Sequence, residues 1–407
     1  MRLLWLTLAD PDPPENGQFL YSSGLIHGVA SAGATLQVIG LARPGGAHRD
    51  GEQSGTVRWS LAAHRPRPGW ASLPSPLPVL AHRPLTAALR RRIEDAARDR
   101  HWDAIVFDSI ALAGALAPIL ASAGEGPCRI VYVAHNFEEG VARRIAEDEP
   151  QSVKRLVRSL DAAKVMRLER SLVRAAHLVT ANTPEDQARY RALSPGGPVL
   201  FLPPAYRGHD VPARTISSTT PRRAVIVGSY DWPPKRASLE AFLAAADGPF
   251  LKAAIELVLV GNAEESFLVE LRRRFAWVTC TGRVEDVAPH LTQARIALVP
   301  DLLGGFKLKG LDYVYNRVPI FGIDGAVPGM PLRQGDSMLL FADHRRLAEG
   351  VIEAIDDFDR LNRLQERAYA ACRGLFDETE LGLQLLAAIA AVDRTQASSA
   401  AAARLQM

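Results

Sequence analysis

The stretch IALVPDLLGGFKLKGLDYVYNRVPIFG, residues 296–322, decides the fold. It begins and ends with short apolar runs, and between them lies GGFKLKGLDY, residues 304–313, with two lysines and an aspartate. Runs this apolar are typical of parallel strands that are buried on both faces of a sheet. The pattern therefore predicts a core strand joined to a core-facing helix, rather than a solvated surface loop.

Strand-like runs alternate with helix-length segments through most of the chain. This βαβ spacing predicts an α/β fold with two Rossmann-like, doubly wound domains facing across a cleft. In such folds ligands bind at the carboxyl ends of the strands and in the cleft between domains. The expected strands are 3–8, 35–41, 104–108, 129–134, 177–181 and 198–203, then 224–229, 255–261, 277–282, 295–300, 318–322 and 338–342.

The chain has 407 residues, more than one hydrophobic core usually supports. A stretch rich in proline, arginine, serine and threonine lacks periodicity and predicts a linker between the domains. The expected organisation is a first domain at 1–204, a linker at 205–223, a second domain at 224–358, C-terminal helices at 359–392 that pack back toward the first domain, and a flexible tail at 393–407.

The composition is that of a soluble globular enzyme, with 47% hydrophobic and 23% charged residues. A net charge of only +3, without a basic stripe interleaved with aromatic residues, argues against a nucleic-acid partner. Three widely spaced cysteines indicate reduced thiols and no zinc site. We expect neither a signal peptide nor a transmembrane segment, so the chain is expected to be cytoplasmic.

One segment, residues 153–176, leaves two interpretations open. It carries seven lysines and arginines against two acids, with apolar residues between them. A basic amphipathic helix can lie on an anionic membrane surface. A solvated helix that packs one face on its own domain is commoner, and base rates favour that interpretation.

The helix predicted after the strand ending near Pro300 carries the candidate chemistry. Gly304 and Gly305 open it, where unpaired backbone N–H groups and the helix dipole favour phosphate, and Lys307 adds a positive charge. Asp312 falls on the apolar face of that helix, where an unpaired carboxylate is costly. Either the glycines shape a turn and a neighbour satisfies Asp312, or this end of the helix binds a diphosphate and Asp312 accepts from a ribose diol.

The run from Pro300 resembles the nucleotide-sugar-binding segment of GT-B glycosyltransferases of family 4. It is most similar to the branch with a Gly-x-Gly-Ile-Lys-x-Lys-x-Leu-Glu motif. The positions that match are Lys307, Lys309, Leu311, Asp312 and Pro319. Asp312 is one methylene shorter than the usual glutamate. Gly304 stands where many members have a sugar-binding acid, so the sugar would be held by its backbone amide, by another group such as Asp301, or by fewer contacts.

Other segments resemble the family in the same order, over roughly residues 1–345. They are 227–243, in which Lys235 replaces the usual asparagine, 282–300, 133–146 and 10–25. The resemblance implies a nucleoside diphosphate sugar as donor. It implies donor contacts by Gly228, Ser229, Lys235, Gly282, Arg283, Val284, Gly304, Gly305, Phe306, Lys307, Leu308 and Asp312.

His135 follows a predicted strand and should project from its carboxyl end. A lone histidine is more often structural, but in the resembled family the matching histidine faces the donor sugar. The resemblance therefore makes His135 and Lys307 the catalytic residues. It places Asn16, Gly17, Gln18 and Asn136 on the acceptor side, although Gln18 stands where a second glycine is common.

The resemblance implies a hexosyltransferase-type enzyme that retains the anomeric configuration and needs no metal or other cofactor. The acid pair in Asp10-Pro-Asp12 is interpreted as turn chemistry rather than a metal site. The acceptor is open between a glycan, a lipid-linked sugar and a small natural product, with peripheral contact to the inner face of the membrane as an option. Two alternatives remain: another GT-B enzyme, such as a nucleotide-sugar epimerase, and a non-catalytic binding or scaffold protein.

Overall fold

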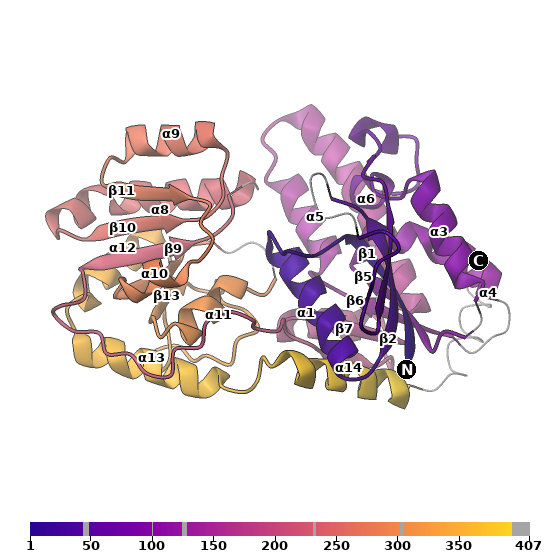
Figure 1. The fold of residues 1–407 in the computed structure, drawn as a ribbon. Helices are drawn as coiled ribbons and strands as arrows, with labels where there is room; N and C mark the ends of the chain where they lie inside the picture. Colours follow the sequence, from indigo (N-terminus) through magenta and orange to yellow (C-terminus); the bar gives the residue numbers. More distant parts are fainter. Residues whose placement is uncertain (44–48, 100, 124–127, 231–232, 302–304, 393–407) are drawn as a thin grey trace. The chain divides into compact units, whose positions relative to one another are not determined.

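The computed structural model describes residues 1–43, 49–99, 101–123, 128–230, 233–301 and 305–392. The chain forms two compact units (Figure 1). Unit 1 comprises Met1–Ala205 and Asp377–Met407, and unit 2 comprises Tyr206–Phe376. Each unit is built on its own sheet, so the predicted α/β class with two Rossmann-like domains is confirmed.

The sheet of unit 1 has the order β3-β4-β2-β1-β5-β6-β7-β8, and only the β3–β4 pair is antiparallel. Its sequence order reverses between β1 and β5, and in doubly wound sheets ligands bind at such a switch point. The strands are β1 (Arg2–Ala9), β2 (Thr35–Leu41), β3 (Gln53–Ser54), β4 (Val57–Ala62), β5 (Ala104–Asp108), β6 (Arg129–Val133), β7 (Leu178–Ala181) and β8 (Val199–Phe201).

Helices cover both faces of this sheet, because successive strand residues point to opposite faces. In β1, Leu4 and Leu6 belong to one core cluster, and Leu3 and Trp5 belong to the other. The helical segments are α1 (Gly17–Ser31), η1 (Gly69–Ser72), α2 (Val79–His82), α3 (Ala87–Ala97), η2 (Ile110–Ala115), α4 (Leu116–Ala123), α5 (Glu138–Glu147), α6 (Ser152–Ala175), α7 (Pro184–Leu193) and α14 (Glu378–Ala391).

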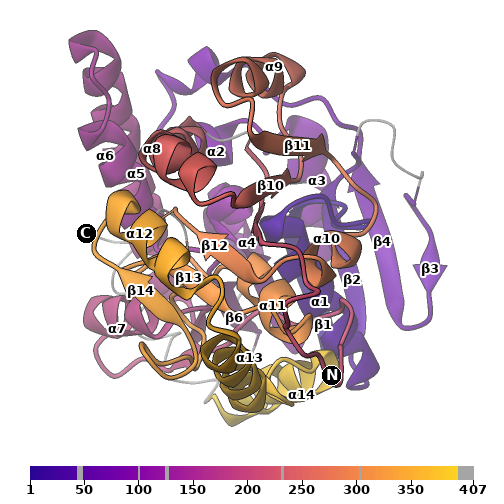
Figure 2. The same ribbon diagram turned by 90° about the vertical axis from the view of Figure 1, so that its left-hand side faces the viewer.

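Unit 2 has an all-parallel sheet with the order β11-β10-β9-β12-β13-β14, and its switch point lies between β9 and β12 (Figure 2). Its strands are β9 (Arg223–Val227), β10 (Glu256–Val260), β11 (Val278–Gly282), β12 (Ile296–Val299), β13 (Ile320–Ile323) and β14 (Leu339–Phe341). Its helices are α8 (Pro233–Lys252), α9 (Glu265–Arg274), α10 (Ala288–Thr292), α11 (Leu308–Tyr315), α12 (His344–Ala354) and α13 (Phe358–Cys372).

The structure differs from the predicted domain boundaries at the linker. Residues from Tyr206 onward belong to unit 2, and Ile216 is 1% exposed within its core. The backbone N–H of Ile216 donates to Asn362 Oδ1 at 2.9 Å, and Asn362 Nδ2 donates to the Ile216 carbonyl at 2.9 Å. The segment predicted to be a linker is therefore part of the second unit, because a buried isoleucine and this paired amide hold it there.

The C-terminal helices are divided between the units, with α13 in unit 2 and α14 in unit 1. Helix α14 packs closely on α1, since a Cβ on Gly382 would lie 2.2 Å from the carbonyl of Gly28. Residues 393–407, for which a flexible tail was predicted, lie outside the described residues.

Candidate active site

The first part of the candidate site lies at the switch point of unit 2, where β12 leads into α11. Asp301 follows β12, and its Oδ2 lies 3.0 Å from Lys307 Nζ; Lys309 binds the other oxygen of the same carboxylate. Lys307 is the N-cap residue of α11, and both Lys307 and Asp301 are 6% exposed. Two lysines on one carboxylate leave a net positive charge at the start of the helix.

Burial and charge act in opposite directions on this cluster. Burial lowers the pKa of Lys307 to about 8, although the charge of Asp301 acts to raise it. Burial alone would raise the pKa of Asp301, but Lys309 and Lys307 more than offset burial and hold that pKa well below its usual range. Asp301 is therefore ionised at neutral pH, and Lys307 stays mostly charged.

The neighbouring strand β9 brings further predicted residues to the same place. The charge of Lys235, in α8, also acts on Lys307 and lowers its pKa further. Gly228 and Ser229 follow β9, and the backbone N–H of Gly228 donates to the carbonyl of Val260 at 3.0 Å. A Cβ on Gly261 would lie 1.9 Å from the carbonyl oxygen of Gly228, so only glycine at 261 permits this approach.

Asp312 lies in α11, next to the hydroxyl of Tyr206. Burial raises the pKa of Asp312 to about 7, the nearby charge of Asp286 adds to the rise, and a hydrogen bond with Tyr206 opposes it. The Tyr206 hydroxyl donates to the carbonyl of His209 at 2.9 Å, so a protonated Asp312 can donate to the hydroxyl oxygen. Tyr206 is held in place by stacking on Tyr315, with ring centroids 4.3 Å apart.

The stability of the protein should therefore depend on the protonation of Asp312. A free aspartate titrates near 3.8, so between pH 3.8 and 7 the folded state holds a proton that the unfolded state has lost. Each pH unit in this window should then lower the free energy of unfolding by up to about 1.4 kcal/mol. Asp312→Asn should remove this pH-dependent decrease in the free energy of unfolding. Denaturant unfolding at pH 5 and pH 8 measures the difference, and Asp359→Asn is the surface control. If Asp312→Asn changed the free energy of unfolding equally at both pH values, that result would contradict this assignment.

The other predicted donor residues lie in unit 2 with different surroundings. Gly282 ends β11 with φ of +71°, and Val284 and Phe306 pack against the core of the unit. Gly305 and Arg283 lie in the loops before α11 and after β11, and Leu308 is the first residue of α11. Gly304 lies outside the described residues, so the prediction that its backbone contacts the sugar remains a prediction.

Unit 1 holds the second group of predicted site residues, at the carboxyl ends of β5 and β6. His135 is 7% exposed, and its Nε2 lies 2.5 Å from Oδ1 of Asp108, which is 1% exposed. The other oxygen of Asp108 accepts from Trp5 Nε1 at 3.0 Å. Burial alone would raise the pKa of Asp108, but His135, together with hydrogen bonds from Trp5 and Ser22, more than offsets burial and lowers that pKa.

This geometry orients the imidazole ring of His135. Because Nε2 faces an ionised carboxylate, we assign the proton of a neutral ring to Nε2. His135 Nδ1 is buried and has no hydrogen-bond partner among the described residues. The edge of the Tyr21 ring packs on the imidazole, with centroids 4.9 Å apart, and Asn182 Nδ2 donates to the His135 carbonyl at 2.7 Å. The ring is therefore held at Nε2, whereas the buried Nδ1 is left without a hydrogen bond in the described part of the chain.

A buried glutamate positions the loop that follows His135. Glu169, in α6, accepts from the backbone N–H groups of Glu138 and Glu139 at 3.1 and 2.7 Å, at the start of α5. Burial raises the pKa of Glu169 to about 7, against the hydrogen bonds that it accepts. Asn136, predicted on the acceptor side, donates from Nδ2 to Glu138 Oε1 at 3.1 Å. Asn136 thus has a structural partner in this loop.

The remaining acceptor-side residues lie at the start of α1. Asn16 is the N-cap, and its Oδ1 accepts from the backbone N–H of Phe19 at 3.0 Å. Gly17 and Gln18 form the first turn, with Gly17 exposed. In the structure the Asn16 side chain caps the N-terminus of α1.

Sequence reasoning missed three side chains that organise these residues: Asp108, Tyr206 and Glu169. Asp108 had a detectable signal, an acid at the end of an apolar strand, where ligands and polar partners gather. Glu169 lies in a basic helix and Tyr206 in the segment predicted to be a linker. Neither position carries a local signal, because Glu139 lies 30 residues before Glu169 and Asp312 lies more than 100 residues after Tyr206.

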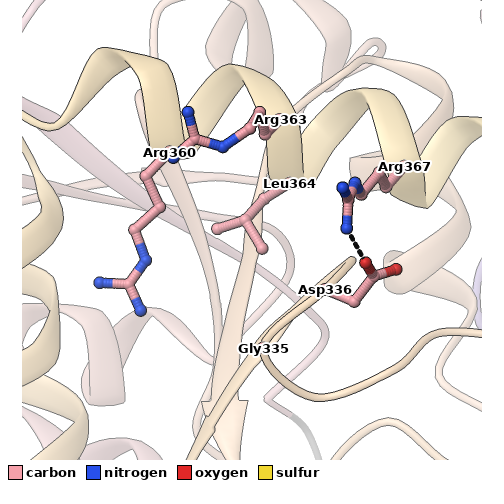
Figure 3. Close-up of a pocket in the computed structure, with 6 residues that line it drawn as sticks. All are labelled: Gly335, Asp336, Arg360, Arg363, Leu364 and Arg367. Atoms are coloured by element: carbon pink, nitrogen blue, oxygen red, sulfur yellow. Dashed lines mark hydrogen bonds and ion pairs between the residues drawn. The ribbon is translucent and has the colours of Figure 1, made fainter.

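A small cavity of about 180 Å³ in unit 2 does not coincide with this site. It is lined by Gly335, Asp336, Arg360, Arg363, Leu364 and Arg367 (Figure 3). Arg367 forms an ion pair with Asp336, whereas Arg360 and Arg363 point away from it in the view of Figure 3. None of the predicted site residues lines this cavity. Within the described part of the chain, no three His, Cys, Asp or Glu side chains are grouped as metal ligands.

Comparisons with known proteins agree with this architecture. Residues 221–357 match the family model described as glycosyl transferases group 1. The fold is similar to sucrose-phosphate synthase from Thermosynechococcus elongatus, with a TM-score of 0.71, 17% identity, and coverage of 95% of this chain and 98% of that one. A search of curated protein sequences finds no match.

Two further similar structures were solved with nucleotide and sugar. Anabaena HepE, in complex with UDP-glucose, has a TM-score of 0.65 and 15% identity, covering 96% of this chain and 99% of that one. The pneumococcal O-GlcNAc transferase GtfA, in complex with UDP and GlcNAc, has a TM-score of 0.61 and 11% identity, covering 96% and 99%. The chain therefore has the GT-B fold of glycosyltransferases, and its residues 221–357 match the glycosyl transferases group 1 family.

Proposed function

We propose that this protein is a glycosyltransferase that moves a hexosyl group from a nucleoside diphosphate sugar to an acceptor hydroxyl. The observation that carries the proposal is the lysine cluster at the β9–β12 switch point. Lys307 and Lys309 pair there with one buried carboxylate, and the charge of Lys235 also acts on Lys307, inside the segment that matches the glycosyl transferases group 1 model. A buried excess of positive charge at this edge of the sheet suits a diphosphate.

In this proposal unit 2 binds the donor. Lys307, Lys235 and the backbone N–H groups at the start of α11 bind the diphosphate, and Asp312 accepts from the ribose diol. A phosphate oxygen can take the place of Asp301 at Lys307, because Asp301 keeps Lys309 as its partner. The neighbours solved with UDP and sugars support a nucleotide-sugar donor and a hexose as the transferred group.

The proposed reaction retains the anomeric configuration. The bond from C1 of the sugar to the diphosphate oxygen breaks, and its electron pair leaves with the diphosphate. The acceptor oxygen bonds to C1 on the same face, and its proton passes to the departing diphosphate oxygen. Lys307 and the N–H groups of α11 stabilise the leaving charge, so the proposal needs neither a protein nucleophile nor a metal.

We propose that His135 forms a hydrogen bond with the donor sugar. Its Nδ1 is the ring atom without a partner among the described residues, and Asp108 holds the opposite nitrogen. C1 gains positive charge in the transition state. The negative charge of Asp108, behind the imidazole, stabilises that charge better than a purely neutral pocket would. The chemistry of the acceptor stays open between a glycan, a lipid-linked sugar and a small natural product.

The donor can be identified by thermal-shift measurements with UDP, GDP, ADP and dTDP, since a specific ligand raises the apparent stability by mass action. Incubation of the matching nucleotide sugars with an acceptor panel, followed by NMR, then tests the reaction. Transfer with an α product from an α donor supports the proposal. An inverted product would contradict retention, an acceptor-free change at the sugar would indicate an epimerase, and binding without any turnover would indicate a non-catalytic protein.

Metal removal gives a separate prediction. Because Lys307 and helix N–H groups are proposed to carry the charge of the leaving diphosphate, treatment with EDTA should leave kcat within about twofold of its untreated value. The measurement is the initial rate before and after chelation, with added Mg²⁺ or Mn²⁺ as the comparison. A rate that disappears with EDTA and returns with Mg²⁺ would show that a metal supplies the charge.

A further inference from the structure

The first half of α6 presents large apolar side chains to solvent. Val153, Leu156, Val157 and Leu160 are 77%, 62%, 44% and 56% exposed, and every residue from 151 to 160 is exposed. Their spacing of three, four and seven residues places them on one face of the helix. The second half differs, since residues such as Leu172 and Val173 are buried in the core of unit 1.

A second element extends this apolar face. Lys164 lies on the same face of α6, four residues after Leu160, and its Nζ donates to the carbonyls of Ser72 and Leu73 at 2.8 and 3.0 Å. This anchors η1 beside α6, together with its exposed side chains Trp70 (75%) and Leu73 (57%). We call the combined surface the apolar patch; it consists of Val153, Leu156, Val157, Leu160, Trp70 and Leu73.

Basic residues surround the apolar patch. Lys154 and Arg158 lie on one flank of the α6 face, and Lys164 ends it. Arg67 lies three residues before Trp70 in the chain, so it adds a positive charge near that end of the patch.

The acids near the apolar patch are mostly paired. Asp161 Oδ1 accepts from the backbone N–H of Val79 at 2.8 Å, at the start of α2. Glu149 is 7% exposed and lies 3.0 Å from Arg158, and Glu147 lies 2.8 Å from Arg143. Asp148 is exposed. Residues 143–164 carry six lysines and arginines against four acids, so a net positive charge remains beside the patch, which fits an anionic partner.

We propose that the apolar patch docks this protein on the surface of an anionic lipid bilayer. The leucine, valine and tryptophan side chains enter the boundary between headgroups and acyl chains, and Lys154 and Arg67 stay at the level of the lipid phosphates. Trp70 suits such a boundary, because an indole has an apolar body and a polar N–H. No helix in the described ranges is long and apolar enough to cross a bilayer, so this contact is peripheral. The proposal does not depend on the proposed sugar transfer.

Vesicle co-sedimentation tests this docking. We expect the wild type to bind vesicles of phosphatidylglycerol and phosphatidylcholine, to bind pure phosphatidylcholine much less, and to be released by 1 M NaCl. Leu156→Gln should lower the partition coefficient about tenfold or more, because one leucine no longer leaves water. Lys154→Glu should lower it about fivefold or more. Leu251→Gln, a leucine 58% exposed at the end of α8, is the matched control and should bind like the wild type.

Trp70 gives an independent readout. On anionic vesicles its fluorescence should shift to the blue and be quenched by brominated acyl chains, and Trp70→Phe should abolish that change. Wild-type protein that stays in the supernatant with anionic vesicles would overturn the proposal, as would equal losses for Leu156→Gln and Leu251→Gln. A lipid-free dimer that Leu156→Gln converts to monomers, seen by light scattering, would instead assign the apolar patch to a second copy of this chain.

Discussion

Lys307→Ala should weaken the binding of the nucleoside diphosphate about 10- to 100-fold and leave the binding of the nucleoside within about twofold. The expected loss follows from the charge-assisted contact between the Lys307 ammonium and phosphate, which contributes roughly 1.5 to 3 kcal/mol. The nucleoside lacks phosphate, so it serves as the internal control. Isothermal titration of both ligands to both proteins measures the difference.

The variant should remain folded, which keeps this test informative. Lys309 still pairs with Asp301 when Lys307 is absent, so the carboxylate does not become a buried, unpaired charge. Lys252→Ala, at the exposed C-terminal end of α8, removes the same charge elsewhere in unit 2 and should bind both ligands normally. Equal losses for diphosphate and nucleoside with Lys307→Ala would show that Lys307 does not contact phosphate.

The pH dependence of diphosphate binding should report the same group. Burial lowers the pKa of Lys307 to about 8, so the ammonium is mostly charged at pH 7 and mostly neutral at pH 9. Affinity for the diphosphate should therefore fall as the pH rises through 8 in the wild type. In Lys307→Ala that part of the pH dependence should be absent.

His135→Ala should lower kcat about 100- to 1,000-fold and leave the affinity for the diphosphate within about twofold. A hydrogen bond that strengthens only as charge develops acts on the transition state, and removing such a group typically has an effect of this size. The diphosphate is bound by unit 2 in our proposal, whereas His135 belongs to unit 1. Single-turnover rates together with titration of the diphosphate separate the two effects.

Asp108→Asn is the informative companion variant. Asparagine keeps an oxygen to accept from Trp5, but it then presents an NH₂ group to His135 Nε2, where the carboxylate accepted. The imidazole proton should move to Nδ1, so kcat should fall and its pH profile should change, although the buried volume is nearly the same. Wild-type kcat in His135→Ala would assign the histidine a structural role, and an unchanged pH profile in Asp108→Asn would remove the positioning role of Asp108.

The strands show which elements of the fold a local sequence pattern can predict. Every strand expected from the sequence has a counterpart, because strands buried on both faces form continuous apolar runs that need no partner to be recognised. The pattern missed β4 and β3. In β4 the apolar Val57, Trp59 and Leu61 alternate with polar residues, and β3 has only two residues. β3 lies at the edge of the sheet and β4 lies next to it, and such strands are specified by the neighbours with which they pair.

What the sequence alone determined is the α/β class, the two sheets, and the position of Lys307 at the start of a helix after a buried strand. These features follow from the periodicity of apolar residues and from the chemistry of helix ends, both of which can be recognised within a few residues of sequence. Tertiary structure decided that Asp301 holds two lysines, that Asp108 fixes His135 across 27 residues, and that Tyr206 meets Asp312. It also decided that α6 leaves an apolar face in solvent. Each of these depends on which side chains packing brings together and buries, and burial sets the pKa of a group and the need for a partner.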